Sequence, residues 1–273
     1  MKAYPLLRWA GGKTQLLPQL RALMPKSFNH YYEPFLGGGA MFFDLAPEHA
    51  TVSDANLELV SCYLAVALQV GSVIHELKKL PIDEKRYYAL RSLKPADLSP
   101  AAAAARTIYL NHTDFNGLYR VNKSGGFNVP WGKWKDDKLP TTCDEENLRA
   151  CSAALQKARI MCADFQSIIA NAEEGSLAYC DPPYVPLTKT ANFTTYTPGG
   201  FGLEDLKRLR ASCCEARQRG AYVMLSQADT PEVREMFGGF RIHSVSARRN
   251  VNCDASKRGK VGEVVITSYE VEP

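Results

Sequence analysis

Short apolar or β-branched runs recur along this 273-residue chain, each about as long as a buried strand. A strand that is covered on both faces has a nearly continuous apolar sequence, as in a parallel sheet between helices. We therefore expect strands at residues 31–35, 51–54, 159–162, 177–180 and 222–225. A last β-rich segment, 263–269, is expected to close the edge of the same sheet.

Segments with helical character alternate with these strands. Residues 41–45 follow the first strand and suit the start of a helix, and Asp144 is expected to cap a helix over 145–157. A further helix is predicted over 203–219. The helix after the second strand has apolar residues that we expect on one face, namely Leu57, Val60, Leu64, Ala67 and Leu68. This alternation predicts a doubly wound α/β core, the architecture called Rossmann-like.

The alternation is interrupted between residues 70 and 140. Ser99-Pro100 signals a helix start ahead of an alanine run, and a stretch rich in Gly, Asn and Pro follows it. That stretch also carries aromatic and basic side chains. We interpret the region as an insertion of different character in the α/β core.

The composition is that of an ordinary globular protein, with 45% hydrophobic and 23% charged residues. The sequence lacks a continuous apolar run of about 18 residues, and its start lacks the apolar core of a signal peptide. We expect a soluble, cytoplasmic protein with no membrane segment. The eight cysteines form no Cys-x-x-Cys pair and the five histidines are scattered, so free thiols and no metal are expected.

Positive charge is concentrated in two parts of a chain whose formal net charge is only +4. Residues 106–140 contain six Lys or Arg against three Asp, and residues 241–260 contain six against Asp254 alone. Such clusters suit a polyanion, because neutralised phosphates release condensed counterions. A solvated basic face is the alternative for either cluster.

A glycine turn follows the first predicted strand, in Glu33-Pro34-Phe35-Leu36-Gly37-Gly38-Gly39. Glycines that lead from a strand into a helix let a ligand approach the bare backbone. Asp54 ends the next strand, where an acidic side chain typically accepts hydrogen bonds from ribose hydroxyls. A nucleoside-bearing cofactor is indicated, but NAD is disfavoured because Phe42 stands where its motif has a third glycine.

A second glycine motif, Ala10-Gly11-Gly12-Lys13-Thr14, invites comparison with a phosphate-binding loop. That loop requires a glycine where Leu7 stands, and no predicted strand precedes this one. A nucleotide triphosphatase is therefore disfavoured.

The motif Asp181-Pro182-Pro183-Tyr184 follows directly on the apolar strand 177–180. The prolines stiffen the loop and leave carbonyl oxygens as acceptors beside a carboxylate. Such a pair can bind both hydrogens of an exocyclic amino group, whose nitrogen is a poor nucleophile while its lone pair is conjugated with the ring. Tyr184 offers a face on which an extruded base could stack. A strand-terminating Pro-Pro turn is the alternative.

Taken in order, the motifs at 9–13, 33–39, 53–56 and 181–184 resemble the Dam family of DNA adenine methyltransferases, over nearly the whole chain. The resemblance implies S-adenosylmethionine as methyl donor and the N6 amino group of adenine in duplex DNA, at GATC, as acceptor. It also implies a flipped base, direct transfer and no metal. The site residues that it implies are Asp181, Pro182 and Tyr184 for catalysis, and Trp9, Ala10, Lys13, Phe35, Gly37, Gly39, Asp54, Asp164, Phe165 and Asp181 for the cofactor.

The same resemblance assigns residues 111–120 to a hairpin that reads DNA. By that likeness Arg120 would read a guanine, Leu118 would touch a thymine methyl group, and Phe115 and Asn116 would lie where the duplex opens. The further DNA contacts that it implies are Arg8, Pro130, Lys133 and Trp134. Phe115 and Trp134 stand where the family pattern has tyrosines, and Lys133 where it has arginine.

The expected organisation is thus a methyltransferase domain of residues 1–56 and 144–273 with an inserted, mainly helical target-recognition domain, 57–143. A monomer is the default expectation. Methylation of a cytosine amino group or of an RNA adenine remains open, since the same Asp-Pro-Pro-Tyr apparatus serves it. A non-catalytic DNA-binding protein on this scaffold is the other alternative.

Overall fold

The strands that the apolar runs predict are all present in a computed structural model, which describes residues 2–122, 125–135, 138–184, 200–248 and 260–271. In this part of the chain they form, together with one further strand, a seven-stranded sheet of order β3-β2-β1-β4-β5-β7-β6. Its strands are β1 (Tyr31–Glu33), β2 (Ala50–Asp54), β3 (Ala158–Cys162), β4 (Leu177–Cys180), β5 (Tyr222–Ala228), β6 (Arg241–Arg248) and β7 (Lys260–Thr267). β1 to β5 pair in parallel, and β7 runs antiparallel to both β5 and β6.

The edge of the sheet differs from the prediction. The segment expected to close it, 263–269, falls mainly in β7, which lies between β5 and β6. The edge strand on this side of the sheet is β6, for which the sequence predicted no strand. Most of its described side chains are exposed or half-buried, and its polar and apolar residues are mixed, so no apolar run marks it.

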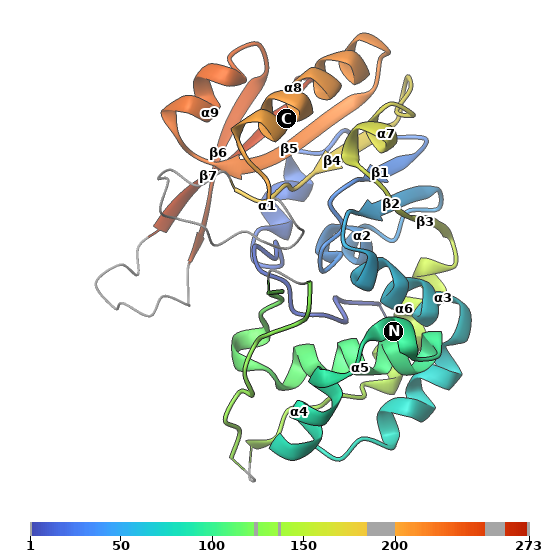
Figure 1. The fold of residues 1–273 in the computed structure, drawn as a ribbon. Helices are drawn as coiled ribbons and strands as arrows, with labels where there is room; N and C mark the ends of the chain where they lie inside the picture. Colours follow the sequence, from blue (N-terminus) through green and yellow to red (C-terminus); the bar gives the residue numbers. More distant parts are fainter. Residues whose placement is uncertain (1, 123–124, 136–137, 185–199, 249–259, 272–273) are drawn as a thin grey trace.

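Helices cover both faces of the sheet (Figure 1). The helices are α1 (Leu17–Ala22), α2 (Ala40–Leu45), α3 (Leu57–Lys78), α4 (Glu84–Ser92), α5 (Pro100–Thr113), α6 (Glu145–Leu155), α7 (Phe165–Ile169), α8 (Leu203–Gln218) and α9 (Pro231–Met236), with short 3₁₀ turns η1 (Pro95–Asp97) and η2 (Phe115–Gly117). The side chains of Ser99 and Asp144 cap α5 and α6, as the sequence predicted for Asp144. The predicted helices 145–157 and 203–219 are confirmed with slightly shorter bounds.

β4 shows how the two layers share the sheet. Leu177 and Tyr179 belong to a core formed with α1 to α6, whereas Ala178 and Cys180 belong to a second core formed with α7, α8 and α9. Successive side chains of a strand point to opposite faces, so a continuous apolar run fills both cores. The doubly wound α/β core that the sequence predicted is therefore confirmed.

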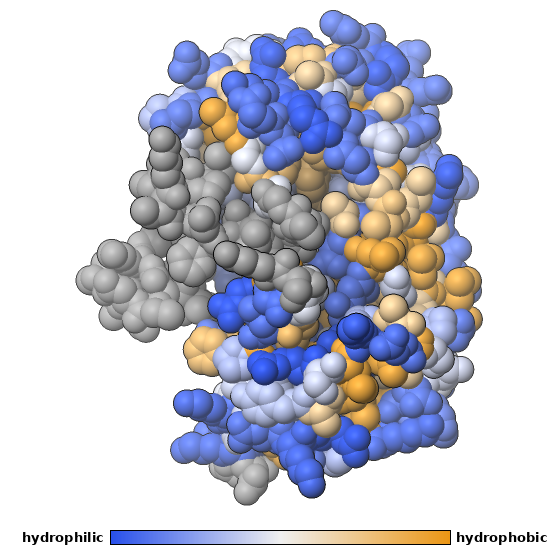
Figure 2. All heavy atoms as spheres, in the orientation of Figure 1, coloured by the Kyte–Doolittle hydropathy of each residue, from blue (hydrophilic) through white to orange (hydrophobic). Residues whose placement is uncertain are grey.

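The buried face of α3 differs from the predicted one. Val60 and Ala67 are buried as expected, but Leu57 is 66% exposed, Leu68 is 74% exposed and Leu64 is also exposed. α3 packs against α5 on one side and against α6, β2 and β3 on another, so its buried positions follow several partners. Apolar side chains accordingly gather on the outer surface over α3 (Figure 2).

α3 is also the one helix among the described residues that is long and apolar enough to cross a membrane. Half of its most apolar stretch is buried inside the protein, and the helix packs against the sheet and two other helices. Its apolar composition is that of a core helix.

The region interrupting the alternation forms the lower part of the molecule in Figure 1, with α4, α5 and a hairpin after α5. The hairpin pairs Asp114 with Trp131 and Val121 with Phe127. α5 continues to Thr113, so only the later part of the motif 111–120 lies in the hairpin.

A buried ion pair joins this region to the start of α3. The Arg106 guanidinium, 2% exposed, lies 2.9 Å from Glu58 Oε1 and also donates to the backbone oxygen of Leu90. Tyr119, in the hairpin, donates its hydroxyl to the other oxygen of Glu58 at 3.0 Å. The hairpin is thus fastened to the helix that follows β2.

Candidate active site

The carboxyl ends of β1 and β4 lie side by side, because these parallel strands are neighbours in the sheet. β1 leads into α2 on one face of the sheet, and α8, the next described helix after β4, lies on the other face. Ligands of open α/β sheets bind at such a switch point, outside the carboxyl ends of the strands. The glycine turn 33–39 and the motif 181–184 therefore meet where this fold binds ligands.

Lys13 lies at the centre of the site, with a side chain that is 4% exposed. Its Nζ is 2.8 Å from Asp181 Oδ1 and 2.8 Å from the backbone oxygen of Gly11. The same Nζ is 5.0 Å from the centre of the Tyr184 ring and 4.0 Å from Glu263 Oε2. Burial raises the pKa of Asp181, and the Lys13 ammonium opposes that rise. The structure thus joins the motifs 9–13 and 181–184 through one ion pair.

Asp54 is fixed beside the glycine turn at the end of β2. Its Oδ2 accepts a hydrogen bond from the backbone N–H of Gly37 at 3.0 Å, and its Oδ1 accepts one from Asn56 at 2.9 Å. Burial raises the pKa of Asp54, and these backbone donors lower it. Tyr63 of α3 donates its hydroxyl to the oxygen of Gly37 at 2.8 Å, which holds the turn from the other side.

The indole of Trp9 covers the glycine turn. A Cβ atom on Gly37 would lie 2.8 Å from Trp9 Cδ1, and Gly37 has a left-handed φ of 49°. Gly39, with a φ of 69°, precedes α2 as its N-cap. Trp9 also stacks on Tyr119 of the hairpin, with ring centres 5.1 Å apart, while the neighbouring Ala10 is exposed. The N-terminal motif therefore lies between the glycine turn and the hairpin.

An aromatic cluster lies where α7 begins. Phe35 and Phe165 stack with ring centres 5.3 Å apart, and Phe201 meets Phe35 edge-on. Asp164 caps α7, and its Oδ2 lies 3.1 Å from the Arg208 guanidinium as an ion pair. The same guanidinium lies over the Phe165 ring. The structure thus brings the predicted pair Asp164 and Phe165 to the predicted Phe35.

The residues assigned to DNA contacts lie around the hairpin and are mostly exposed, namely Arg8, Phe115, Asn116, Leu118, Arg120, Pro130 and Lys133. Arg120 donates from Nε to Asn128 Oδ1 at 2.8 Å, a contact within the hairpin that orients the guanidinium. Trp134 is half-buried, and its indole N–H donates to the backbone oxygen of Thr113 at 2.8 Å. The indole N–H of Trp134 is therefore engaged by the protein backbone in this structure.

Arg8 supports the turn that carries these residues. A Cβ atom on Gly117 would lie 2.5 Å from Arg8 Cδ, so the arginine side chain runs directly under η2. Both backbone polar groups of Arg8 bind the side-chain amide of Asn111, at 2.7 and 2.9 Å. The N-terminal segment is thereby fixed to the end of α5.

Comparison with known proteins identifies the family. A model of D12 class N6 adenine-specific DNA methyltransferases matches residues 9–251. The chain belongs to this family of DNA methyltransferases. It is 39% identical to the Type II methyltransferase M1.LlaDCHI of Lactococcus lactis subsp. cremoris, over 97% of this chain and 95% of that one. The DNA adenine methylases of Vibrio cholerae and Escherichia coli are 34% and 33% identical, with 95% and 93% of their lengths covered.

The resemblance to the Dam family is confirmed by these relatives, and membership implies S-adenosylmethionine as methyl donor. The polar and aromatic side chains at this site are of the kinds that would hold that molecule. Asp54 and Asp164 supply carboxylates for hydroxyl and amino hydrogens, and Phe35 and Phe165 supply aromatic faces. These carboxylates and rings lie at the carboxyl ends of neighbouring strands, beside the glycine turn.

The structure also identifies residues near the site that sequence reasoning missed, namely Glu263, Tyr119, Tyr63 and Arg208. Glu263 gives the clearest signal in the sequence, because it is a lone carboxylate at the head of the apolar run 264–266. The other three have no local signal. Their contacts with the site come from distant parts of the chain.

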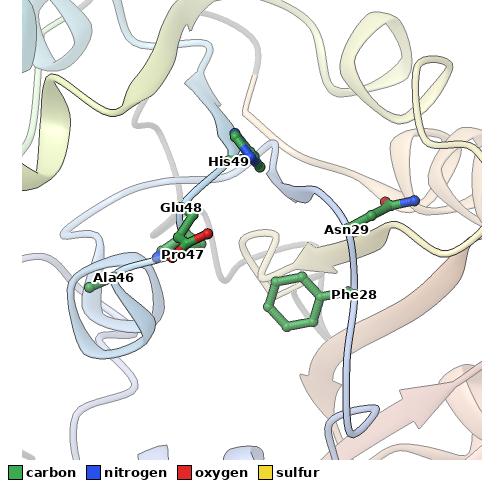
Figure 3. Close-up of a pocket in the computed structure, with 6 residues that line it drawn as sticks. All are labelled: Phe28, Asn29, Ala46, Pro47, Glu48 and His49. Atoms are coloured by element: carbon green, nitrogen blue, oxygen red, sulfur yellow. The ribbon is translucent and has the colours of Figure 1, made fainter.

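A hollow of the methyltransferase lies elsewhere, away from these motifs. It has a volume of about 570 Å³ and is lined by Phe28, Asn29 and the segment Ala46 to His49 (Figure 3). These residues precede β1 and β2, so the hollow lies at the amino ends of those strands, opposite the end at which ligands usually bind such sheets. The motif residues do not line it.

Among the described residues no group of His, Cys, Asp or Glu has the arrangement of a metal site. The described cysteines carry free thiols: Cys62, Cys143, Cys151, Cys162, Cys180, Cys213 and Cys214. Of the basic clusters, Lys123, Arg249, Lys257 and Arg258 lie outside the described residues.

Proposed function

We propose that this methyltransferase transfers a methyl group from S-adenosylmethionine to the N6 nitrogen of adenine in duplex DNA, at GATC, with the target base flipped out of the helix. The main support for this proposal is the position of Asp181, a largely buried carboxylate at the end of β4, beside the glycine turn and Lys13. An acceptor for an amino group and a site for a nucleoside cofactor thus lie next to each other. Relatives named DNA adenine methylase support the choice of adenine.

The cofactor would be held by residues of three neighbouring strand ends. Asp54 accepts hydrogen bonds from ribose hydroxyls, Phe165 lies against the adenine ring, and Asp164 accepts from the amino group of that ring. Trp9, Ala10 and Lys13 form the N-terminal part of the cofactor pocket, and Phe35, Gly37 and Gly39 line its methionine side. When bound, S-adenosylmethionine supplies a methyl group on a positively charged sulfur, which keeps the electron pair as the carbon–sulfur bond breaks.

The target adenine would be held by the loop after β4. Asp181 and the backbone oxygen of Pro182 accept the two amino hydrogens, which draws the nitrogen toward tetrahedral geometry and frees its lone pair. The Tyr184 ring stacks against the base. Asp181 then stabilises the positive charge that develops on the nitrogen, and once the carbon–nitrogen bond has formed that nitrogen releases one proton to water. No covalent bond to the protein is needed.

Recognition of the duplex is assigned to residues 57–143, inserted between the two parts of the methyltransferase domain, 1–56 and 144–273. Arg120 would pair with the O6 and N7 of a guanine, and Leu118 would contact a thymine methyl group. Phe115 and Asn116 would enter the duplex beside the flipped base. Their exposure on one turn, braced by Arg8, supports this assignment.

The proposal is tested by transfer of labelled methyl from S-adenosylmethionine to two short duplexes, one containing GATC and one with that site scrambled. We expect label on the GATC duplex alone, recovered as N6-methyladenine. Label on both duplexes would retain the reaction but refute the assigned site. Label recovered as a methylated cytosine, or found only on RNA, would refute the choice of substrate.

The role of Asp181 is tested separately with Asp181→Ala. This variant should lose methyl transfer while its affinity for the duplex remains measurable, because the hairpin that binds DNA is unchanged. Full activity of the variant would refute the mechanism. A protein that binds both cofactor and duplex but never transfers methyl would instead be a non-catalytic member of the family.

A further inference from the structure

One feature of the site conflicts with the proposed reaction. Asp181 is assigned to accept a hydrogen of the target amino group, yet its Oδ1 already binds the Lys13 ammonium at 2.8 Å. The Tyr184 ring, assigned to stack on the target base, lies 5.0 Å from the same ammonium. A positive charge at this place also opposes the positive charge that develops on the amino nitrogen during transfer. A second partner that draws Lys13 away from Asp181 would therefore favour entry of the base.

Glu263 has the properties of that partner. It lies in β7, and its Oε2 is 4.0 Å from Lys13 Nζ, just beyond hydrogen-bond distance. The same oxygen is buried and has no hydrogen-bond partner among the described residues. Buried carboxylate oxygens normally have a partner, so this one is a vacant acceptor next to a movable donor.

The rest of the local structure permits a short movement. The Lys13 ammonium has three N–H donors, of which Gly11 and Asp181 each engage one. The Gly11 contact is local and can stay, while a shift of about 1 Å would bring Nζ to Glu263. The backbone of Glu263 is paired on both sides, with β5 and with β6, so the side chain extends from a fixed point of the sheet.

We propose that Glu263 is a positioning residue for methyl transfer: it receives the Lys13 ammonium as the target amino group replaces that ammonium at Asp181. Asp181 and Glu263 thus share one lysine, which neutralises Asp181 before the base enters and is withdrawn afterwards. The exchange moves one ammonium between two carboxylates and transfers no proton. This inference rests on the proposed function, because it assumes an amino group at Asp181.

The test is single-turnover methyl transfer at saturating S-adenosylmethionine and duplex, with Glu263→Gln. The amide keeps the shape of the side chain but cannot hold the ammonium as an ion pair. We expect the rate to fall about tenfold or more, with dissociation constants for cofactor and duplex within about twofold of the unaltered protein. The matched control is Glu270→Gln, which makes the same change at an exposed carboxylate on the same C-terminal segment and should leave the rate unchanged.

A second measurement separates positioning from a merely structural role. In a Lys13→Met background, Glu263→Gln should have almost no further effect on the rate, because Glu263 acts through Lys13. Equal losses in both backgrounds would overturn the proposal, as would an unchanged rate in the single variant. Glu263→Asp keeps the charge but shortens the side chain, so its rate should lie between those of Glu263→Gln and the unaltered protein. If Glu263→Gln does not fold, Glu263→Asp takes its place: its loss of rate should vanish in the Lys13→Met background, and an equal loss in both backgrounds overturns the proposal.

Failure of the proposed function is recognised independently. If the unaltered protein transfers methyl to no duplex, the proposed function fails and this inference fails with it. If the unaltered protein is active and the Glu263 variants match it, only the inference fails.

Discussion

The packing of Trp9 over the glycine turn can be tested by Gly37→Ala. The new Cβ would lie 2.8 Å from Trp9 Cδ1, nearer than real Cβ atoms approach a neighbour, and the φ of 49° is left-handed. A left-handed conformation costs an L-residue about 1–2 kcal/mol. Overpacking of a filled site costs about 1–3 kcal/mol, so the free energy of unfolding should fall by about 2–5 kcal/mol in total.

Gly11→Ala is the matched control for the backbone contribution. Gly11 has a φ of 80°, but no atom lies within 4 Å of the position of its Cβ, so only the left-handed strain applies. Its cost should be about 1–2 kcal/mol. The difference between the two variants then measures the contact with Trp9.

The assay is urea unfolding followed by circular dichroism, with the dissociation constant of S-adenosylmethionine measured by calorimetry. In a Trp9→Leu background the cost of Gly37→Ala should shrink by about the overpacking contribution, roughly 1–3 kcal/mol. The packing of Trp9 on the turn is contradicted if Gly37→Ala costs no more than Gly11→Ala, or if its cost is the same with and without Trp9. In either case the indole would not confine the turn.

The other predictions concern residues 57–143, which we assign to DNA recognition. Arg120→Ala should cost about 1–3 kcal/mol of binding at one guanine and relax specificity there, and a uniform loss across all duplexes would instead mark a phosphate contact. Arg106→Met should lower the free energy of unfolding by about 3–5 kcal/mol, because it leaves the Glu58 carboxylate without its ion-pair partner. Arg149→Met removes an exposed ion pair and should cost under about 1 kcal/mol. Equal urea midpoints of the two variants would contradict this prediction. Burial raises the pKa of Asp114 to about 8, above about 4 for an unfolded aspartate, so the stability of the unaltered protein relative to Asp114→Asn should fall as the pH rises through this window. A difference that stays constant from about pH 5 to about pH 9 would show that the carboxyl does not titrate there.

Much of the fold was predictable because its signals are local. The parallel strands are apolar runs that fill two cores, and the cap of α6 is a side chain next to the helix that it caps. β6 was missed because an edge strand needs no apolar run. The buried face of α3 was wrong at Leu57, Leu64 and Leu68 because α5, α6 and the sheet approach that helix from different sides.

For the site, the residues that we assign to the chemistry could be found from local sequence: the glycine turn, Asp54 and the loop Asp181–Tyr184 each end or follow a strand, and each is recognisable from adjacent residues. Which of them meet depends on the fold. The order of strands places β1 beside β4, so Lys13 reaches Asp181, and the antiparallel insertion of β7 brings Glu263 to the same ammonium. Motifs are written in neighbouring residues, whereas these contacts join segments that are remote in the chain and depend on the packing of the whole sheet.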